Sequence, residues 1–297
     1  MRLLVTGGTG FIGAPLCQAL AQRGHELVVL TRAPQGRSGP AGVRFAPLEP
    51  DGWRHALEGV DAVINLAGES IAAKRWSPRQ KLRIRDSRVQ TTRRLVEAIA
   101  ATPRKPTALI SASAVGYYGA RDDGELVETD APGRGFLGET CQAVEAEARR
   151  AEALGVRVVR LRIGLVLGQG GGALAKMVPP FRAWLGGPVG DGRQWVSWIH
   201  RDDVIGLVDW ALTRPERSGA VNATAPAPVT MATLCRELGR ALRRPSWLPV
   251  PGAALRLLLG EMADLLLTGQ RVLPRAALEG GYVFRFPALA GALEACV

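Results

Sequence analysis

The chain has 297 residues and is 47% hydrophobic, enough apolar material to bury a large core in one extended domain or one and a half. This composition excludes a disordered or fibrous protein, and we expect no signal peptide because no charged segment with a long apolar core opens the chain. A net charge of +11 would indicate a nucleic-acid partner if the cations clustered, but arginine is spread along the chain.

The cysteines and the most apolar stretch exclude further classes of protein. The four cysteines form no C-x-x-C pair, so they predict neither a disulfide framework nor a zinc site. Residues 255–267 are apolar but interrupted by charges, which indicates an amphipathic helix that covers the core or forms a dimer contact rather than a membrane span. We therefore expect a cytoplasmic protein that binds no metal, no nucleic acid and no membrane.

Strand-like and helix-like patterns alternate along the first half of the chain. The predicted strands cover residues 2–7, 26–32, 61–68, 107–115 and 156–168, and the predicted helices cover residues 13–24, 79–102 and 138–155. This alternation predicts an α/β fold with a doubly wound parallel sheet. The dense basic run from Arg75 to Arg94 is interpreted as a solvated helix face with some anion contacts, not as a DNA-binding element.

The glycines after the first predicted strand have a spacing that matters for nucleotide binding. "VTGGTGFIG" has the pattern G-x-x-G-x-x-G between a strand and a helix, which lets backbone N–H groups and the helix N-terminus approach a pyrophosphate. The alternative is a tight turn whose glycines serve only steric needs. We favour dinucleotide binding. The expected contacts are Thr6, Gly7, Thr9, Gly10, Phe11, Ile12 and Gly13.

The second predicted strand ends with Thr31 and Arg32, about 20 residues past the glycines, where an acidic residue would hold the adenosine ribose of NAD. A hydroxyl and a guanidinium suit the 2′-phosphate of NADP instead, because arginine offers a planar fork of donors to phosphate oxygens. The alternative is that Arg32 is only a solvent-facing charge. We expect NADP rather than NAD.

Five motifs resemble one superfamily in their order and spacing: "TGGTGFIG", "DAVINLAGE", "ISASAVGYYG", "RIGLVLG" and "SWIHRDDV". They are similar to the extended branch of the short-chain dehydrogenase/reductases. The whole chain resembles an epimerase-like, atypical subgroup (NAD-dependent epimerase/dehydratase) with a C-terminal domain of undetermined role. The resemblance implies a Rossmann-type NADP-binding domain over residues 1–168. A smaller substrate-side portion follows over residues 169–297, and strands near residues 195–222 can return to the main fold.

The resemblance also implies catalytic positions, and this sequence departs from them. Typical members carry a Ser or Thr at a strand end, then a Tyr with a Lys four residues later on the next helix. Ser113 fits the serine position. With Glu145 as the anchor, Leu137 stands at the tyrosine position and Cys141 at the lysine position. The usual proton-transfer pair is therefore absent.

Other groups near the same strand end are candidates to replace this pair. Tyr117 and Tyr118 follow Ser113 on the loop that leaves the strand, and either is a plausible proton source. The alternative is that one packs under the loop and the other caps it. Glu69 is a candidate base or a ligand of backbone N–H groups. We expect His200 to be structural and to border the substrate pocket.

Further cofactor contacts are implied by the resemblance at the end of the third predicted strand, on the long helix and on the last strand. They are Leu66, Ala67, Gly68, Glu69, Arg88 and Val166. We expect the Arg88 guanidinium to reach the pyrophosphate and Val166 to flank the nicotinamide. In the C-terminal third, Trp184, Trp195 and Trp198 bind a planar or sugar-like substrate or pack in the core, and both alternatives stay open.

Two functions from different classes remain. The first is an NADP-dependent oxidoreductase or epimerase that acts on an unknown carbonyl or sugar-like small molecule. The second is a non-catalytic NADP(H)-binding regulator or redox sensor. Ser113 and the tyrosine pair favour the enzyme, whereas the missing Tyr and Lys favour the regulator. A homodimer is an open expectation.

Overall fold

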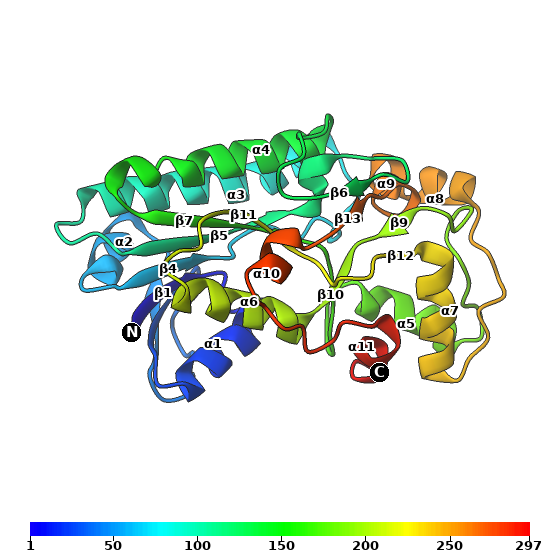
Figure 1. Cartoon of the computed structure of the whole chain (residues 1–297), viewed down its shortest axis with the longest axis horizontal. Helices are drawn as coiled ribbons and strands as arrows, with labels where there is room; N and C mark the ends of the chain where they lie inside the picture. The colour runs from blue at the N-terminus through cyan, green and yellow to red at the C-terminus, as the bar shows by residue number, and fades with distance from the viewer.

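Seven parallel strands form the central sheet of the protein, in the order β3-β2-β1-β4-β5-β7-β11 (Figure 1). The computed structural model describes residues 1–297, apart from the side chains of residues 50, 51 and 54. The strands are β1 (Arg2–Thr6), β2 (Glu26–Thr31), β3 (Val43–Pro47), β4 (Ala62–Asn65), β5 (Ala108–Ala114), β7 (Arg157–Ile163) and β11 (Gly219–Ala223). The prediction of an α/β fold with a doubly wound, Rossmann-type parallel sheet is confirmed.

Helices cover both faces of this sheet (Figure 1). They are α1 (Gly13–Gln22) and α6 (Arg201–Thr213) on one face, and α2 (Pro50–Leu57), α3 (Pro78–Ala101) and α4 (Phe136–Arg149) on the other. The strands are apolar on both sides: Leu3 and Val5 of β1 pack with Leu16 of α1, while Leu4 packs with Leu95 of α3. Burial of both faces explains why the predicted strands appear as continuous apolar runs.

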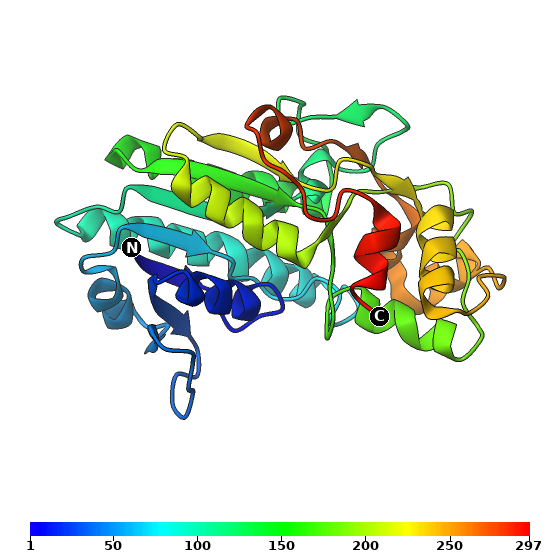
Figure 2. The same cartoon turned by 60° about the horizontal axis from the view of Figure 1, so that its bottom comes forward.

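Helices and short strand pairs build the remaining part of the molecule (Figure 2). The short strands are β6 (Glu125–Leu126), β8 (Leu165–Leu167), β9 (Trp195–Val196), β10 (Trp198–His200), β12 (Val229–Thr230) and β13 (Arg271–Val272). The helices are η1 (Val115–Tyr118), η2 (Glu152–Leu154), α5 (Leu174–Arg182), α7 (Met231–Leu242), α8 (Gly252–Leu259), η3 (Gly260–Ala263), α9 (Asp264–Leu267), α10 (Arg275–Glu279) and α11 (Leu289–Glu294). Within the described residues, no helix is both long and apolar enough to cross a membrane.

Two predicted elements are broken by glycines. The strand predicted at 156–168 ends at Gly164, where an added Cβ would lie 2.2 Å from the Ser197 carbonyl oxygen, and β8 then leaves the sheet to pair with β10. The helix predicted at 255–267 is interrupted at Gly260, whose φ of +60° is unfavourable for residues with a Cβ. The domain boundary at residue 168 stays a prediction, and α6 and β11 pack on the main sheet beyond it.

Candidate functional site

The loops at the carboxyl ends of β1, β4 and β5 lie at one end of the parallel sheet (Figure 1), and the loop after β8 meets the glycine loop there through Phe11. The chain runs from β1 to β2 on one side, and β4 lies on the other side of β1. Such a reversal of strand order is where open α/β sheets bind ligands. The N-terminus of α1 opens here, so the glycine loop lies at this position in the sheet.

Neighbouring backbone atoms crowd the glycine loop at Gly7 and Gly13 but leave space at Gly10. Gly7 has a φ of +71°, and an added Cβ would lie 2.6 Å from the Leu66 carbonyl oxygen. A Cβ on Gly13 would lie 2.1 Å from the Gly7 carbonyl oxygen. A Cβ on Gly10 would meet only that same oxygen, at 3.3 Å. The exposed Gly10 therefore leaves space above the start of α1, which fits a phosphate group held by backbone N–H groups.

Two predicted cofactor residues in this loop have side chains that are engaged by the protein itself. The Thr6 hydroxyl is buried and donates to Asn65 Oδ1 at 2.6 Å. The Phe11 ring packs against the loop after β8, where an added Cβ on Gly171 or Gly172 would lie 2.6 or 2.7 Å from it. The Thr6 hydroxyl is thus engaged within the protein, and cofactor contact by Thr6 and Phe11 stays a prediction. The contacts of Thr9, Ile12, Leu66 and Ala67 stay predictions.

The end of β2 carries two cations. Arg32 is exposed and forms no ion pair with a described side chain. Arg37 donates through Nε to the Ala33 carbonyl oxygen at 2.8 Å, which keeps it in the same loop. Thr31 is buried, and its hydroxyl accepts from the Ala33 N–H at 3.5 Å. This arrangement suits a phosphate better than a ribose hydroxyl that seeks an acceptor.

Ser113 lies at the carboxyl end of β5 beside a buried ion pair. Its Oγ donates to Glu145 Oε1 at 2.9 Å. Arg162 of β7 holds the same carboxylate with two bonds, Nε to Oε1 at 2.9 Å and Nη2 to Oε2 at 3.0 Å. Burial opposes the charge on Arg162, but the bonds to Glu145 raise its pKa above the ordinary value. Because the Ser113 proton points at Glu145, the Ser113 oxygen can accept a hydrogen bond from a ligand.

The two adjacent tyrosines have different environments. Tyr118 is fully buried, its hydroxyl donates to Asn222 Oδ1 at 2.7 Å and accepts from Arg162 Nη1 at 2.9 Å, and burial raises its pKa to about 12. These contacts favour the alternative that Tyr118 packs under the loop, and its role as a proton source stays an untested prediction. Tyr117 is partly exposed, and its ring stacks on Arg162 with 3.4 Å between Cζ and the ring centroid. The Tyr117 hydroxyl bonds to no described residue, which leaves it free for a ligand.

Leu137 and Cys141 of α4 face the turn that follows β5. A Cβ on Gly116 of this turn would lie 3.2 Å from the Leu137 Cβ and 4.0 Å from the Cys141 sulfur. Burial raises the pKa of the Cys141 thiol, which keeps it protonated and neutral. Helix α4 therefore presents neither a phenol nor an ammonium group at this turn.

Arg88 of α3 places a cation at the end of β4. The Arg88 guanidinium packs against Gly68, where an added Cβ would lie 2.8 Å from Cζ. Its Nη1 donates to the Ile84 carbonyl oxygen at 3.0 Å, and its other nitrogens bond to no described residue. Burial lowers the pKa of Arg88, while the nearby Glu69 carboxylate favours its charge. Arg88 thus lies at the end of β4 with donors free for a ligand.

His200 and Val166 lie on the strand pair β8–β10. His200 begins α6, where its Nδ1 accepts from the Asp202 N–H at 3.1 Å, and its ring lies 3.9 Å from that of Phe286. Burial lowers the pKa of His200. These contacts agree with the expected structural role. Val166 is partly exposed and pairs with Ile199, and its contact with a nicotinamide stays a prediction.

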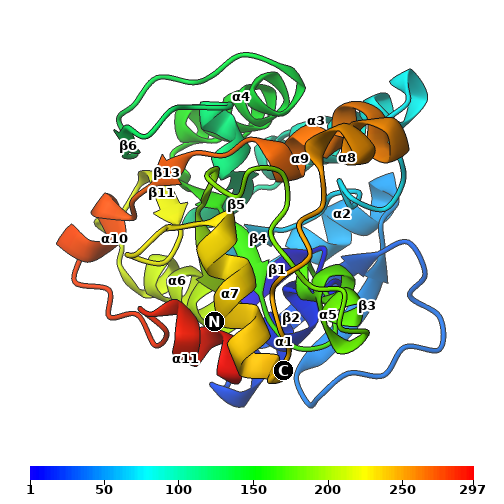
Figure 3. The ribbon, with the colours of Figure 1, turned by 90° about the vertical axis from the view of Figure 1, so that its right-hand side faces the viewer.

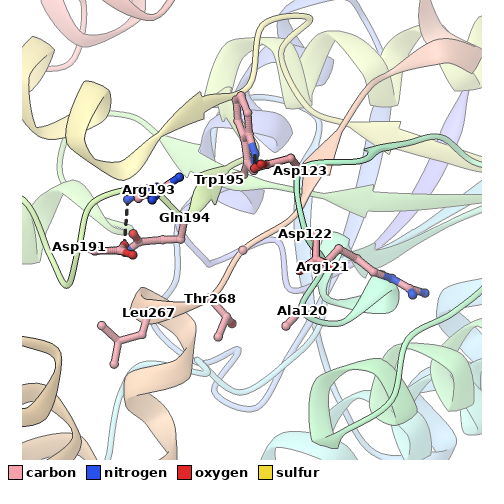
Figure 4. Close-up of a pocket in the computed structure, with 11 residues that line it drawn as sticks. Ala120, Arg121, Asp122, Asp123, Asp191, Arg193, Gln194, Trp195, Leu267 and Thr268 are labelled. Atoms are coloured by element: carbon pink, nitrogen blue, oxygen red, sulfur yellow. Dashed lines mark hydrogen bonds between the residues drawn. The ribbon is translucent and has the colours of Figure 1, made fainter.

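A cavity of about 360 Å³ opens beside the turn after β5 (Figure 4). Asp123 and Asp191 line it together with Trp195, whose Nε1 donates to Asp123 Oδ1 at 2.8 Å. The wall of the cavity is joined to the turn because Gln270 Nε2 donates to the Val115 carbonyl oxygen at 2.8 Å. A polar recess therefore adjoins the loop that carries Tyr117.

Trp184, Trp195 and Trp198 lie in different surroundings. Trp198 is fully buried in the core, and Trp184 is exposed. Of the three, only Trp195 lines the cavity. Trp198 therefore packs in the core, Trp195 lines the cavity, and Trp184 does neither.

Sequence reasoning missed Arg162 and used Glu145 only as an alignment anchor. A signal was present, because an arginine within the apolar run "VRVVRLRIG" of a two-sided buried strand requires a buried acid nearby. Glu145 lies on the inward face of the neighbouring helix, beside the buried Val144 and Ala148. This pattern indicates that Arg162 has an acidic partner, but it does not indicate that the same acid contacts Ser113.

Comparison with known proteins gives the family and several similar members. Residues 3–223 match the "NAD dependent epimerase/dehydratase family", and residues 250–296 match a "Domain of unknown function (DUF1731)". The "Epimerase family protein SDR39U1 homolog, chloroplastic" of Arabidopsis thaliana is 44% identical over 99% of this chain and 86% of its own length. The "Epimerase family protein SDR39U1" of Mus musculus is 42% identical over 99% of both chains.

A solved structure is similar over nearly its whole length. The human epimerase family protein SDR39U1 (isoform 2), crystallised with NADPH, has a TM-score of 0.88 and 37% sequence identity. The match covers 99% of this chain and 98% of the human chain.

Proposed function

Because the chain belongs to the NAD dependent epimerase/dehydratase family, we propose that it is an NADP(H)-dependent oxidoreductase or epimerase. Its substrate in this proposal is a small carbonyl or sugar-like molecule. Family membership confirms the resemblance found in the motifs. The NADPH in the human structure agrees with the prediction of NADP. The observation that carries the proposal is the joining of the open glycine loop, the Arg32 cation and the Ser113 cluster at one edge of the sheet.

The residues present fit a phosphorylated dinucleotide. The N–H groups around Gly10 would hold the pyrophosphate, and Arg32 with Arg37 would hold the 2′-phosphate at the end of β2. The other half of the dinucleotide would then extend over β4 and β5, where Arg88 offers free donors. When bound, NADP(H) supplies or accepts a hydride.

The chain's own residues would orient the substrate and move a proton. Ser113 would accept a hydrogen bond from a substrate hydroxyl while its own proton stays on the Glu145 side. Tyr117 is the proposed proton donor, since its hydroxyl is free and its ring is held by Arg162. The cavity near Trp195 would accommodate the rest of the substrate.

The cofactor part is tested by titrating NADPH and NADH into wild-type protein and into Arg32→Ala. Loss of charge-assisted phosphate bonds, about 1.5–3 kcal/mol, should weaken NADPH binding about 10- to 100-fold and leave NADH nearly unchanged. Arg214→Ala, which removes an exposed arginine far from the end of β2, is the matched control. Equal loss for both nucleotides would refute the choice of NADP.

The catalytic part is tested by turnover of carbonyl compounds and nucleotide sugars with NADPH or NADP. Tyr117→Phe should lower kcat by about 100-fold or more, because positioned proton transfer contributes about 10²–10⁴. Ser113→Ala should lower it as well, while both variants keep NADPH affinity. If NADPH binds tightly and no compound on a broad panel is converted, the enzyme proposal fails.

A further inference from the structure

The loops that follow α5 and α7, two helices labelled in Figure 3, contain exposed apolar side chains. Trp184 and Leu185 follow α5, and Trp247 and Leu248 follow α7. They are 56%, 54%, 62% and 37% exposed. We call these four residues the tryptophan patch. Large apolar side chains exposed together on a soluble fold usually mark an interaction surface.

Hydrogen bonds join the two segments of the tryptophan patch into one unit. The N–H groups of Trp247 and Leu248 both donate to the Gly186 carbonyl oxygen, at 3.0 and 3.1 Å. The Trp247 Nε1 donates to the Trp184 carbonyl oxygen at 3.1 Å. The backbones approach so closely that a Cβ on Gly187 would lie 1.9 Å from the Leu248 carbonyl oxygen. The patch is therefore presented by a braced pair of loops.

Unfavourable backbone conformations occur at the same place. In the part of the chain that the structure describes, the non-glycine residues with positive φ are Trp184 at +64° and Arg243 at +53°. Each costs free energy and persists only where surrounding contacts hold it. Both border the braced loops. Trp184 follows the last turn of α5 and Arg243 caps α7, so these two residues fix where the braced loops begin.

The surroundings of the tryptophan patch are strongly basic. Residues 182–188 and 236–251 contain five arginines and one carboxylate, Glu237. Glu237 already pairs with Arg236 and Arg240. Arg182, Arg243 and Arg244 form no ion pair with a described residue, and the Arg244 guanidinium lies 4.8 Å from the Trp184 ring centroid. The patch therefore combines aromatic rings with uncompensated positive charge.

We propose that the tryptophan patch docks the protein on an anionic membrane surface as a peripheral contact. Tryptophan and leucine side chains enter the headgroup layer, while surrounding arginines bind lipid phosphates and are attracted by the negative surface potential. Trp184, Leu185 and Trp247 are each more than half exposed, which suits contact with a headgroup layer. A second copy fits less well, because a two-fold contact would place the arginines of both copies against each other. This docking goes beyond the proposed reaction and is independent of it.

Co-sedimentation with vesicles tests the proposal on the full chain. Wild-type protein should bind phosphatidylcholine vesicles that contain added phosphatidylserine, and bind pure phosphatidylcholine vesicles at least about tenfold more weakly. Trp184→Ser with Trp247→Ser should reduce binding to the anionic vesicles by about tenfold or more. Arg182→Glu with Arg244→Glu should do the same. Thermal unfolding and NADPH affinity of the variants check that each is folded.

A matched variant separates a patch from general attraction by net charge. Arg83→Glu with Arg94→Glu reverses two exposed charges on α3 and changes the net charge equally. It should keep most of the vesicle binding. Equal loss in both charge variants would overturn the proposal, as would no binding by wild-type protein. The proposal would also be overturned if the protein bound no vesicles but formed a dimer that Trp184→Ser with Trp247→Ser abolished. Retention on polyglutamate without vesicle binding would overturn it too.

Discussion

Replacing Glu145 with alanine should destabilise the protein far more than replacing Glu147, which lies two residues further along α4. Glu145 is 1% exposed and accepts two bonds from Arg162, one from Arg160 and one from Ser113. Its removal leaves the Arg162 guanidinium buried without its counter-charge. Loss of one partner of a buried ion pair costs about 3–5 kcal/mol, a large fraction of the 5–15 kcal/mol typical of a folded domain.

Glu147 provides the control because it also holds two arginines. Its partners, Arg93 and Arg150, have side chains that are 42% and 52% exposed. Such exposed pairs contribute about 0–1 kcal/mol, so Glu147→Ala should have a small effect. Urea unfolding followed by tryptophan fluorescence measures both free energies. Equal losses, or a loss below about 1 kcal/mol for Glu145→Ala, would refute the reasoning.

Three further outcomes follow from the site. Gly13→Ala should lower the unfolding temperature because its Cβ would lie 2.1 Å from the Gly7 carbonyl oxygen. Gly10→Ala should fold normally but weaken NADPH binding by about tenfold or more. A destabilised Gly10→Ala beside a normally folded Gly13→Ala would contradict the role of the loop. Burial lowers the pKa of His200 below 6.5, so neutral His200 adds stability above about pH 6.5 that is lost as pH falls. Acidification from about pH 7.5 to 5 should therefore lower the unfolding temperature less in His200→Asn than in wild-type protein. Identical pH profiles of the two proteins would contradict this. Arg88→Met should weaken NADPH binding about 5- to 20-fold but leave adenosine 2′,5′-bisphosphate unchanged in calorimetric titration; equal loss for both would place Arg88 elsewhere.

The parts of the fold that sequence could predict are local in origin. Buried parallel strands, the glycine spacing and the capped helices each leave a signal within about 20 residues. The sequence does not predict β3 and α2, because both are short and β3 has no fully buried residue. The break at Gly260 was missed since one glycine also fits within a helix.

The site was predictable in its backbone and less so in its side chains. Which of the adjacent Tyr117 and Tyr118 is buried depends on the short turn η1, a detail that the letters "GYYG" do not contain. The tryptophan patch joins residues 184 and 247, and this contact exists only after folding. The sequence indicated no membrane partner for that reason.

The return of α6 and β11 to the main sheet determines how the chain can be cut. A fragment that ends at residue 168 would leave β7 as an open edge, and it would remove the Gly171 and Gly172 contacts of Phe11. We expect such a fragment to aggregate, whereas an expressible nucleotide-binding unit must extend past Ala223. The cavity near Trp195 is lined by residues 120–123, 191–195 and 267–269, which lie before β7, between β7 and β11, and after β11. Exchange of the cavity lining between relatives should therefore require all three segments, and fail by joining two halves end to end.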